Sequence, residues 1–228
     1  MEPVIRLRAV VSLLGRFPAL AGVDLDVDRG EVVVLHGANG AGKTTLLKVC
    51  AGLVGVAEGE ARVLGADLRA DRRAVRTRVG LLSHQSGLYD ELTVADNVRF
   101  WARAAGADLA DAEAAMDRLG LAGRLRDVVV ARLSAGQRRR TSLACLVARR
   151  PELWLLDEPH AGLDAEGRDL LDGLVARASD AGATIVLASH EHDRSEALSS
   201  RVVTLGGGVV VADSATRPGT GTGAPGAA

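Results

Sequence analysis

The chain has 228 residues, 47% of them hydrophobic, which is enough to bury a core as one domain or as a domain with a subdomain. Its 28 Lys and Arg residues balance 29 Asp and Glu residues, so the net charge of -1 gives no electrostatic reason to expect nucleic acid or an acidic membrane surface as a partner. No stretch approaches the roughly 20 apolar residues that cross a bilayer, and Glu2, Arg6 and Arg8 interrupt an N-terminus that does not resemble a signal peptide. We therefore expect a cytoplasmic globular protein, linked to a membrane only through another protein.

The first third of the chain is rich in strand patterns. Three segments are β-branched or alternating: residues 4–11, 23–27 and 32–36. A glycine-rich turn follows Gly37, an apolar helical pattern covers residues 43–53, and residues 59–67 return to short strands. The pattern predicts a strand-rich N-terminal layer followed by strand, loop and helix.

The rest of the chain alternates helices with buried strands. The pattern is helical from about residue 92 to 150, and we expect a helical subdomain over residues 86–150. Residues 153–157 and 184–189 are apolar runs on either side of a helix expected at 166–181, the alternation of buried parallel strands with crossover helices. The core is therefore expected to be α/β.

Two isolated features complete the survey of the chain. Residues 202–205 and 209–212 flank three glycines and predict a hairpin, and we expect one domain over residues 1–213 with a flexible tail at 214–228. Cys50 and Cys145 lie in apolar helical patterns without CxxC spacing, so we predict that both are small core residues.

Residues 37–44 fit the pattern G-x-x-x-x-G-K-[ST], directly after a predicted strand and directly before a predicted helix. Small residues let backbone N–H groups close around phosphate oxygens, Lys43 reaches the terminal phosphates, and the Thr44 hydroxyl can ligate Mg²⁺. Lys43 and Lys48 are the only lysines in an arginine-rich chain, which favours a specific need for Lys43. The alternative is a glycine-rich turn with a surface lysine. The context predicts a phosphate-binding loop, a P-loop.

The apolar run at residues 153–157 ends in two acids before Pro159. Asp157 would approach the metal, and Glu158 would polarise an attacking water. The alternative is a strand whose terminal acids face solvent. Together with a P-loop upstream, the pattern indicates nucleotide hydrolysis.

Residues 133–137 read Leu-Ser-Ala-Gly-Gln before a predicted helix and resemble the Leu-Ser-Gly-Gly-Gln signature of the ABC-transporter ATPases, with Ala135 at the first glycine position. The helix N-terminus would offer the Ser134 hydroxyl and the Gly136 backbone to a phosphate, whereas a plain helix cap is the alternative for Ser134. In the family this segment serves the nucleotide held by a partner's P-loop. The resemblance therefore implies a head-to-tail pair of ATPase subunits around two ATP molecules.

Three further positions match the family pattern in the expected order. Gln85 corresponds to the Q-loop glutamine, residues 161–164 to the D-loop, and His190 to the switch histidine. A helix cap is the alternative for Asp164, and a strand-end histidine with a local partner is the alternative for His190. The resemblance extends over residues 4–212 and implies a P-loop NTPase of the ABC ATPase type, with a mainly parallel core sheet, an N-terminal antiparallel β layer and a helical subdomain.

The resemblance also implies a set of site residues. ATP would contact Gly37, Ala38, Asn39, Gly40, Ala41, Gly42, Lys43, Thr44, Thr45, Gln85, Ser134, Gly136 and Gln137. Mg²⁺ would be held by Thr44, Gln85 and Asp157, and the catalytic residues would be Lys43, Glu158 and His190. Leu14 aligns with the family's adenine-stacking aromatic, and Phe17 is the alternative. We expect the arginines at 138–140 on a solvated helical face, and His36 and His160 near strand ends or loops.

Residues 83–88, 92–98 and 133–140 resemble the ATP-binding subunits of haem exporters in cytochrome c maturation. This implies an ATPase coupled to transport, peripheral on the inner face of the cell membrane, with an integral membrane permease as partner and no contact with cargo or nucleic acid. The alternatives are the ATPase of a drug, lipid or polysaccharide exporter, a soluble ABC protein acting on ribosomes or DNA, and a P-loop kinase or GTPase. Leu88 and Tyr89 are the expected anchor for the permease, unless both pack under the helical block.

Overall fold

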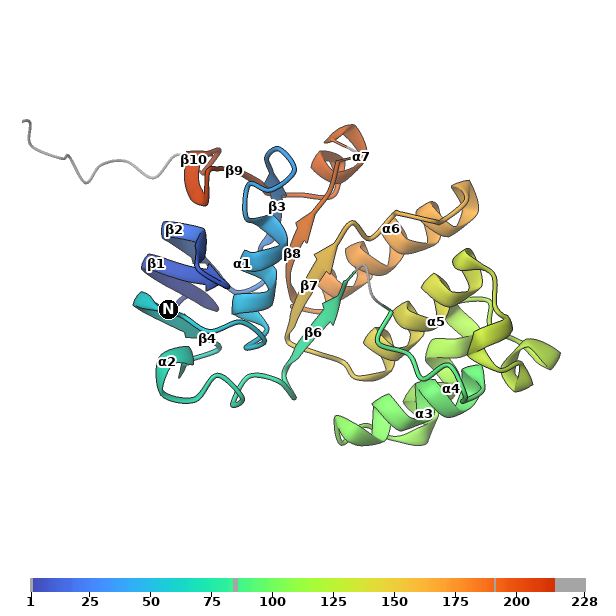
Figure 1. The fold of residues 1–228 in the computed structure, drawn as a ribbon. Coiled ribbons are helices and arrows are strands. Elements are labelled where there is room, and N and C mark those ends of the chain that lie inside the picture. The colour runs from blue at the N-terminus through green and yellow to red at the C-terminus, as the bar shows by residue number, and fades with distance from the viewer. Residues whose placement is uncertain (1, 84–85, 191, 216–228) are drawn as a thin grey trace, which may run out of the picture.

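The computed structural model describes residues 2–83, 86–190 and 192–215. Two sheets pack on either side of α1 (Lys43–Cys50), and further helices cover the outer face of the larger sheet (Figure 1). The smaller sheet is antiparallel, in the order β2 (Phe17–Val27), β1 (Ile5–Leu14), β4 (Glu58–Val63) and β5 (Ala66–Asp67). The predicted N-terminal antiparallel layer is therefore confirmed.

The larger sheet is mainly parallel, as predicted. Its order is β10 (Val209–Asp213), β9 (Arg201–Gly206), β3 (Val32–His36), β8 (Thr184–Ala188), β7 (Leu153–Asp157) and β6 (Val79–Leu82). Among the described strands of this sheet, only the β9–β10 hairpin pair is antiparallel. The strand β6 lies between an arginine-rich and a polar segment, and its four residues carry little periodicity in the sequence.

Strands buried on both faces explain the unbroken apolar runs of the sequence. Successive side chains point to opposite faces of the sheet, so Val33 and Leu35 join the core around α1, whereas Val32 and Val34 join the core under the outer helices. The strands β7 and β8 divide in the same way. The larger sheet is therefore the shared wall of two hydrophobic cores.

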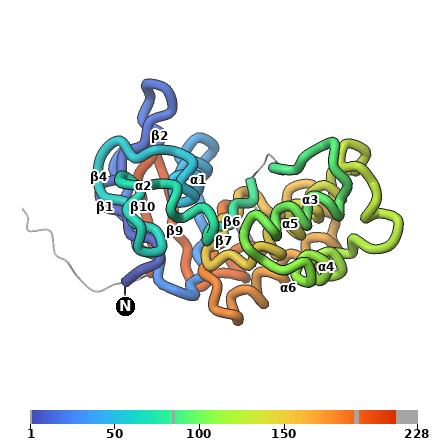
Figure 2. The backbone as a smooth tube through the Cα atoms, turned by 90° about the horizontal axis from the view of Figure 1, so that it is seen from below, coloured from blue at the N-terminus to red at the C-terminus, as the bar shows by residue number. Residues whose placement is uncertain are grey.

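The outer helices are the predicted helical block together with α6 (Ala165–Asp180). The block consists of α3 (Val94–Ala104), α4 (Leu109–Arg118), two 3-10 turns (Gly123–Asp127 and Val130–Arg132) and α5 (Ala135–Ala148). Figure 2 shows it on the opposite side of the molecule from β1, β2 and β4. Gly80 allows close packing of the block on β6, since a Cβ there would lie 2.2 Å from Leu146 Cδ1 and 2.7 Å from Pro151 Cγ. The short helices α2 (Leu68–Asp71) and α7 (His192–Ala197) complete the fold.

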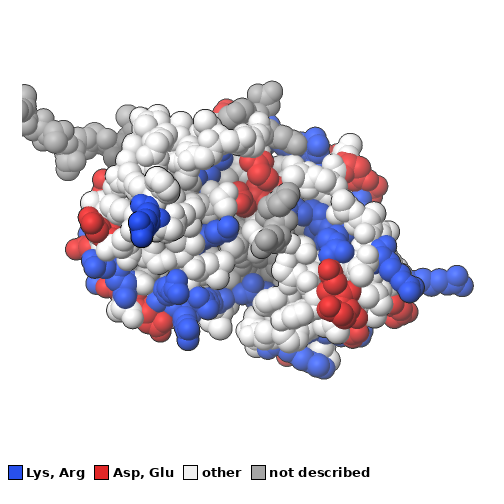
Figure 3. Space-filling model, viewed as in Figure 1, with Lys and Arg blue, Asp and Glu red and all other residues white. Residues whose placement is uncertain are grey.

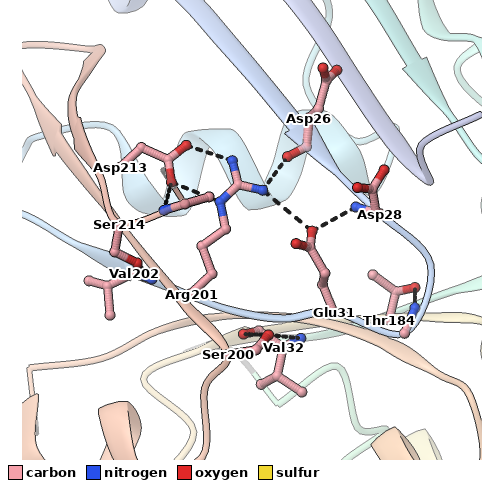
Figure 4. A network of polar contacts seen from close by, with 12 residues as sticks. Asp26, Asp28, Glu31, Val32, Thr184, Ser200, Arg201, Val202, Asp213 and Ser214 are labelled. Carbon is pink, nitrogen blue, oxygen red and sulfur yellow. Dashed lines mark hydrogen bonds and ion pairs between the residues drawn. The ribbon is translucent and has the colours of Figure 1, made fainter. Parts of the chain in front are cut away.

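A buried arginine joins the C-terminal hairpin to both sheets (Figure 4). Arg201 is 8% exposed and donates from Nε and Nη2 to the two carboxylate oxygens of Asp213, at 2.8 and 2.5 Å. Its Nη1 donates to the Asp26 carbonyl at 2.9 Å and lies 3.4 Å from a Glu31 carboxylate oxygen. The hydrogen bond to Asp213 raises the pKa of Arg201. The bidentate pair joins the two strands of the hairpin, and the contacts of Nη1 fix the hairpin against the end of β2 and the start of β3.

The surface is consistent with the balanced composition. On the face in Figure 3, acidic and basic side chains are interspersed among uncharged ones. No helix in the described ranges is long and apolar enough to cross a bilayer.

Both cysteines lie in the core, as predicted. Cys50 is 1% and Cys145 is 7% exposed, and burial raises the pKa of each thiol to about 12. Thiolates are the reactive form, so the native protein near neutral pH should not be alkylated by iodoacetamide, while both cysteines should react in denaturant. Mass spectrometry measures this, and rapid labelling of Cys50 in the native protein would contradict its burial.

Candidate functional site

Four parallel strands bring the predicted site residues to one edge of the larger sheet. The P-loop follows β3, His190 follows β8, Asp157 ends β7, and Ser83 follows β6. The carboxyl ends of parallel strands meet at one edge, where α/β proteins bind ligands. A cavity of about 330 Å³ there is lined by Leu14, Ala19, Asn39, Gly40, Ala41, Gly42, Lys43, Thr44, Thr45, Asp157, Glu158 and His190.

The P-loop is folded around its own lysine. Lys43 is 7% exposed, and its Nζ donates to the carbonyls of Gly37 at 2.6 Å and Ala38 at 3.2 Å. Lys43 is also the first residue of α1, whose first turn contains no acidic residue. The unpaired N–H groups of this turn and the ammonium group together form an anion site.

Two glycines of the P-loop cannot be replaced without moving backbone. Gly42 has φ 106°, and a Cβ there would lie 2.7 Å from the Ala19 carbonyl oxygen. A Cβ on Gly37, at φ 140°, would lie 2.3 Å from the Leu205 carbonyl oxygen. The hairpins β1–β2 and β9–β10 therefore hold the loop from two sides.

Thr44 and Asp157 meet across the cavity. The Thr44 hydroxyl donates to Asp157 Oδ2 at 2.9 Å, and Asp157 is 7% exposed. A hydroxyl and a carboxylate oxygen at this separation are the hard ligands that Mg²⁺ takes, with phosphate oxygens and water completing its shell. Gln85, the third predicted metal ligand, lies outside the described residues.

Glu158 and His190 form the second polar pair of the cavity. The His190 backbone N–H donates to Glu158 Oε2 at 3.2 Å, and His190 Nε2 lies 3.3 Å from Glu158 Oε1. Glu158 has φ 46°, a left-handed conformation that a residue other than glycine rarely adopts. The strained backbone turns the Glu158 side chain away from the line of β7 and into the cavity, where it remains partly exposed.

The residues of the Leu-Ser-Ala-Gly-Gln segment lie in a different cavity. Ser134, Gly136 and Gln137 line a space of about 500 Å³ together with Arg140 and Asp164. Ser134 caps α5: its hydroxyl accepts from the Gln137 N–H at 3.2 Å, and Gln137 Oε1 accepts from the Ser134 N–H at 3.0 Å. The structure therefore separates the predicted nucleotide contacts into two groups.

Comparison with known proteins identifies this arrangement. Residues 20–161 match the sequence family described as ABC transporter. The cytochrome c biogenesis ATP-binding export protein CcmA of Bordetella bronchiseptica is 42% identical over 81% of this chain and 83% of its own length. The protein of the same name from Rhodopseudomonas palustris is 39% identical over 80% of this chain and 90% of its own length. This chain belongs to the ABC transporter family.

A solved structure of the family agrees in fold. An ATP-binding cassette in a dimeric post-hydrolysis state, bound to ADP and phosphate, superimposes with a TM-score of 0.81 at 25% identity, over 92% of this chain and 97% of that one. The chain is an ABC ATPase, which binds nucleotide and couples ATP hydrolysis to transport.

Of the two residues predicted to contact adenine, one lies close to the phosphate site. Leu14 lines the P-loop cavity and is 53% exposed, whereas Phe17 is 79% exposed and is not among the lining residues. The two lie opposite each other where β1 and β2 meet. Leu14 therefore stays the better prediction for an apolar contact with the base.

The prediction that the arginines at 138–140 lie on a solvated helical face is wrong for Arg139. Arg139 does not lie on a solvated face: it is partly buried and donates to the carbonyls of Ser83, Asp157, Glu158 and Pro159. Burial lowers its pKa to about 10, although the charges of Asp157 and Glu158 raise it. Helical spacing did not single out Arg139, because Arg138 lies at the same intervals, three, four and seven positions, before the buried residues 141, 142 and 145.

His160 was expected merely near a loop, and its contacts were not predicted. It is 2% exposed, and its Nε2 pairs with Asp172 Oδ1 at 2.8 Å. Asp172 in turn accepts from Arg194 at 2.5 Å. His36 ends β3 as predicted and lies 3.6 Å from Glu196. These contacts tie the segment after Glu158 to α6 and α7.

The capping box predicts a measurable stability effect. Ser134→Ala removes the side-chain acceptor and should lower the free energy of unfolding by about 1 kcal/mol, measured by urea denaturation without nucleotide. Ser134→Asp should retain most of the stability, because Asp caps as well as Ser. Equal stability of Ser134→Ala and the unmodified protein would contradict the cap.

Proposed function

We propose that this ABC ATPase powers an exporter that supplies haem for cytochrome c biogenesis, and that Mg²⁺ assists hydrolysis at the P-loop cavity. The observation that carries the chemistry is the convergence of Lys43, the Thr44–Asp157 pair and the Glu158–His190 pair on one cavity. The cargo rests on relatives whose names describe ATP-binding export in cytochrome c biogenesis. An exporter of drug, lipid or polysaccharide remains the alternative, and identification of the permease partner would discriminate between them.

Phosphate binding follows from the N-terminal turn of α1. The backbone N–H groups of residues 40–45 and the Lys43 ammonium would surround the β- and γ-phosphates. Lys43 would exchange the carbonyls of Gly37 and Ala38 for phosphate oxygens, which are stronger acceptors for an ammonium group. The Thr44 hydroxyl and Asp157 would hold Mg²⁺, which neutralises charge that develops on the transferred phosphoryl group.

Glu158 would polarise the attacking water. Its carboxylate lines the cavity and is oriented by His190, which contacts both carboxylate oxygens. A carboxylate in this position accepts a proton or a hydrogen bond from water as the water attacks the γ-phosphate. His190 would orient the Glu158 carboxylate, and from its place after β8 it would also sense the γ-phosphate.

A second copy would complete the site. Ser134, Gly136 and Gln137 line a cavity apart from the P-loop, so a single chain carries two halves of a site that do not meet. In a head-to-tail pair each half would complete the partner's. The dimeric state of a solved cassette supports this assembly.

The segment after Gln85 would contact the permease. Leu88 is partly buried against the helical core, as the alternative interpretation required, whereas Tyr89 is 44% exposed. The Tyr89 ring contacts those of Phe100 and Trp101, with centroids 5.1 and 6.3 Å away. Asn97 holds the Tyr89 backbone through its N–H and carbonyl, at 2.8 and 3.0 Å. An exposed aromatic cluster on a fixed backbone suits a hydrophobic partner surface, which would hold the ATPase at the inner face of the membrane.

The hydrolytic role of Glu158 is testable. Glu158→Gln keeps the size of the side chain and one of its two acceptor oxygens but removes its charge, so it should bind ATP and lower kcat by roughly 100-fold or more. It should also accumulate a nucleotide-bound dimer in gel filtration. Hydrolysis by Glu158→Gln at the unmodified rate would refute the assignment.

The Lys43→Ala variant makes a separate prediction. It should weaken ATP binding by about 10- to 100-fold in calorimetry.

Docking through the aromatic cluster makes a separate prediction. The pair Tyr89→Ser and Phe100→Ser should leave the ATPase activity of the isolated subunit intact and abolish its co-purification with the membrane permease. Leu109→Ser, at the same exposure as Tyr89 but at the start of α4, is the matched control. Undiminished co-purification of the Tyr89 and Phe100 variant would exclude this surface.

A further inference from the structure

The Arg139 side chain lies under the loop that carries Glu158. Its Nη2 donates to the Glu158 carbonyl at 2.6 Å and to the Asp157 carbonyl at 3.2 Å, and its Nε donates to the Pro159 carbonyl at 3.2 Å. Its Nη1 donates to the Ser83 carbonyl at 2.8 Å. One guanidinium group therefore binds three successive carbonyls at the end of β7 and one at the end of β6.

These contacts stabilise an unfavourable backbone. Glu158 has φ 46°, and a side chain with a Cβ meets steric strain in that region. Besides Arg139, the Ala161 N–H donates to the Glu158 carbonyl, at 3.1 Å, and the Glu158 N–H donates to the Ala188 carbonyl at 2.8 Å. A planar, charged fork that binds several carbonyls at once can hold such a conformation where one neutral hydrogen bond would not.

Arg139 also connects the two halves of the site. It lies on α5, the helix whose first turn is capped by Ser134 and Gln137. Its contact to Ser83 reaches the last described residue before Gln85. A rotation of α5 would therefore move the guanidinium group relative to the carbonyls of residues 157–159.

We propose that Arg139 is a positioning residue for ATP hydrolysis, which holds the backbone at residues 157–159 so that Glu158 points into the P-loop cavity, and which links that backbone to the helix carrying Ser134. The proposal rests on the role of Glu158 proposed above. Arg139 makes no contact with substrate in this role, so it acts on turnover and leaves phosphate binding to the P-loop.

The neighbouring arginine provides a matched control. Arg138 lies on the same helix, and its guanidinium pairs with Asp90 and donates to the Val130 carbonyl. Within the described residues, Arg138 makes no hydrogen bond to residues 157–159. Arg138→Gln therefore removes an equal charge from the same helix without removing support from the Glu158 loop.

The experiment compares steady-state ATPase kinetics and ATP affinity of the full-length variants. Arg139→Gln should lower kcat roughly 100-fold, the scale expected for a misplaced catalytic group, while the Kd for ATP changes by less than about threefold. Arg139→Lys should be intermediate, because one ammonium group replaces only part of the fork. Arg138→Gln should keep kcat within about twofold of the unmodified protein.

A double variant separates action through Glu158 from general destabilisation. If Arg139 acts through Glu158, Arg139→Gln should cause no further loss of kcat in a Glu158→Gln background. The inference would be overturned if the kcat losses of the two single variants multiplied in the double variant, or if Arg139→Gln had the same kcat as Arg138→Gln. Either result would leave the role of Glu158 intact. Unmodified hydrolysis by Glu158→Gln alone would overturn both.

Folding is checked by circular dichroism and thermal unfolding. If Arg139→Gln does not fold, the comparison passes to Arg139→Lys and Arg138→Lys, which keep the positive charge. A lower kcat at unchanged ATP affinity in Arg139→Lys alone supports the positioning role. Equal kcat values in the two lysine variants overturn it.

Discussion

Parallel pairing of β3, β8, β7 and β6 is the constraint on which the site depends. Residue-by-residue hydrogen bonding between β3 and β8 and between β8 and β7 aligns the ends of these strands. The P-loop, His190 and the Asp157–Glu158 pair then meet, although more than a hundred residues separate the P-loop from Asp157. Burial of both sheet faces keeps the strands in register, since a slip of one residue would exchange the two cores.

The same sheet explains why one chain holds the two groups of predicted nucleotide contacts in separate cavities. The segment at Ser134 opens α5, which packs on the outer face of the sheet and faces a different cavity from the P-loop. Arg139, about one turn along α5, links this helix directly to the Glu158 loop. In the head-to-tail pair proposed above, assembly and turnover at the P-loop would therefore be coupled through one helix.

Two arginines, Arg139 and Arg201, carry their charge into enclosed places. Arg201 is paired with a carboxylate and supports the hairpin that flanks the P-loop, whereas Arg139 is paired with backbone carbonyls close to the acids of the site. Hydrogen bonds from a charged donor are stronger than neutral ones, and partial burial strengthens them further. These two guanidinium groups thus stabilise the backbone around the site.

The sequence by itself determined the fold class, the P-loop and the acidic strand end, because these depend on local patterns of apolar periodicity and glycine spacing. It gave the helix cap at Ser134 only as the alternative to a phosphate contact, and the structure shows the cap. The sequence left open whether Leu88 and Tyr89 form an exposed anchor or pack under the helical block. Only the tertiary structure decided that Leu88 is packed and Tyr89 is exposed, that Arg139 leaves the solvated face, and that His160 pairs with Asp172. Each of these depends on contacts between segments distant in the chain. A local pattern carries no information about which distant segment packs against a given residue.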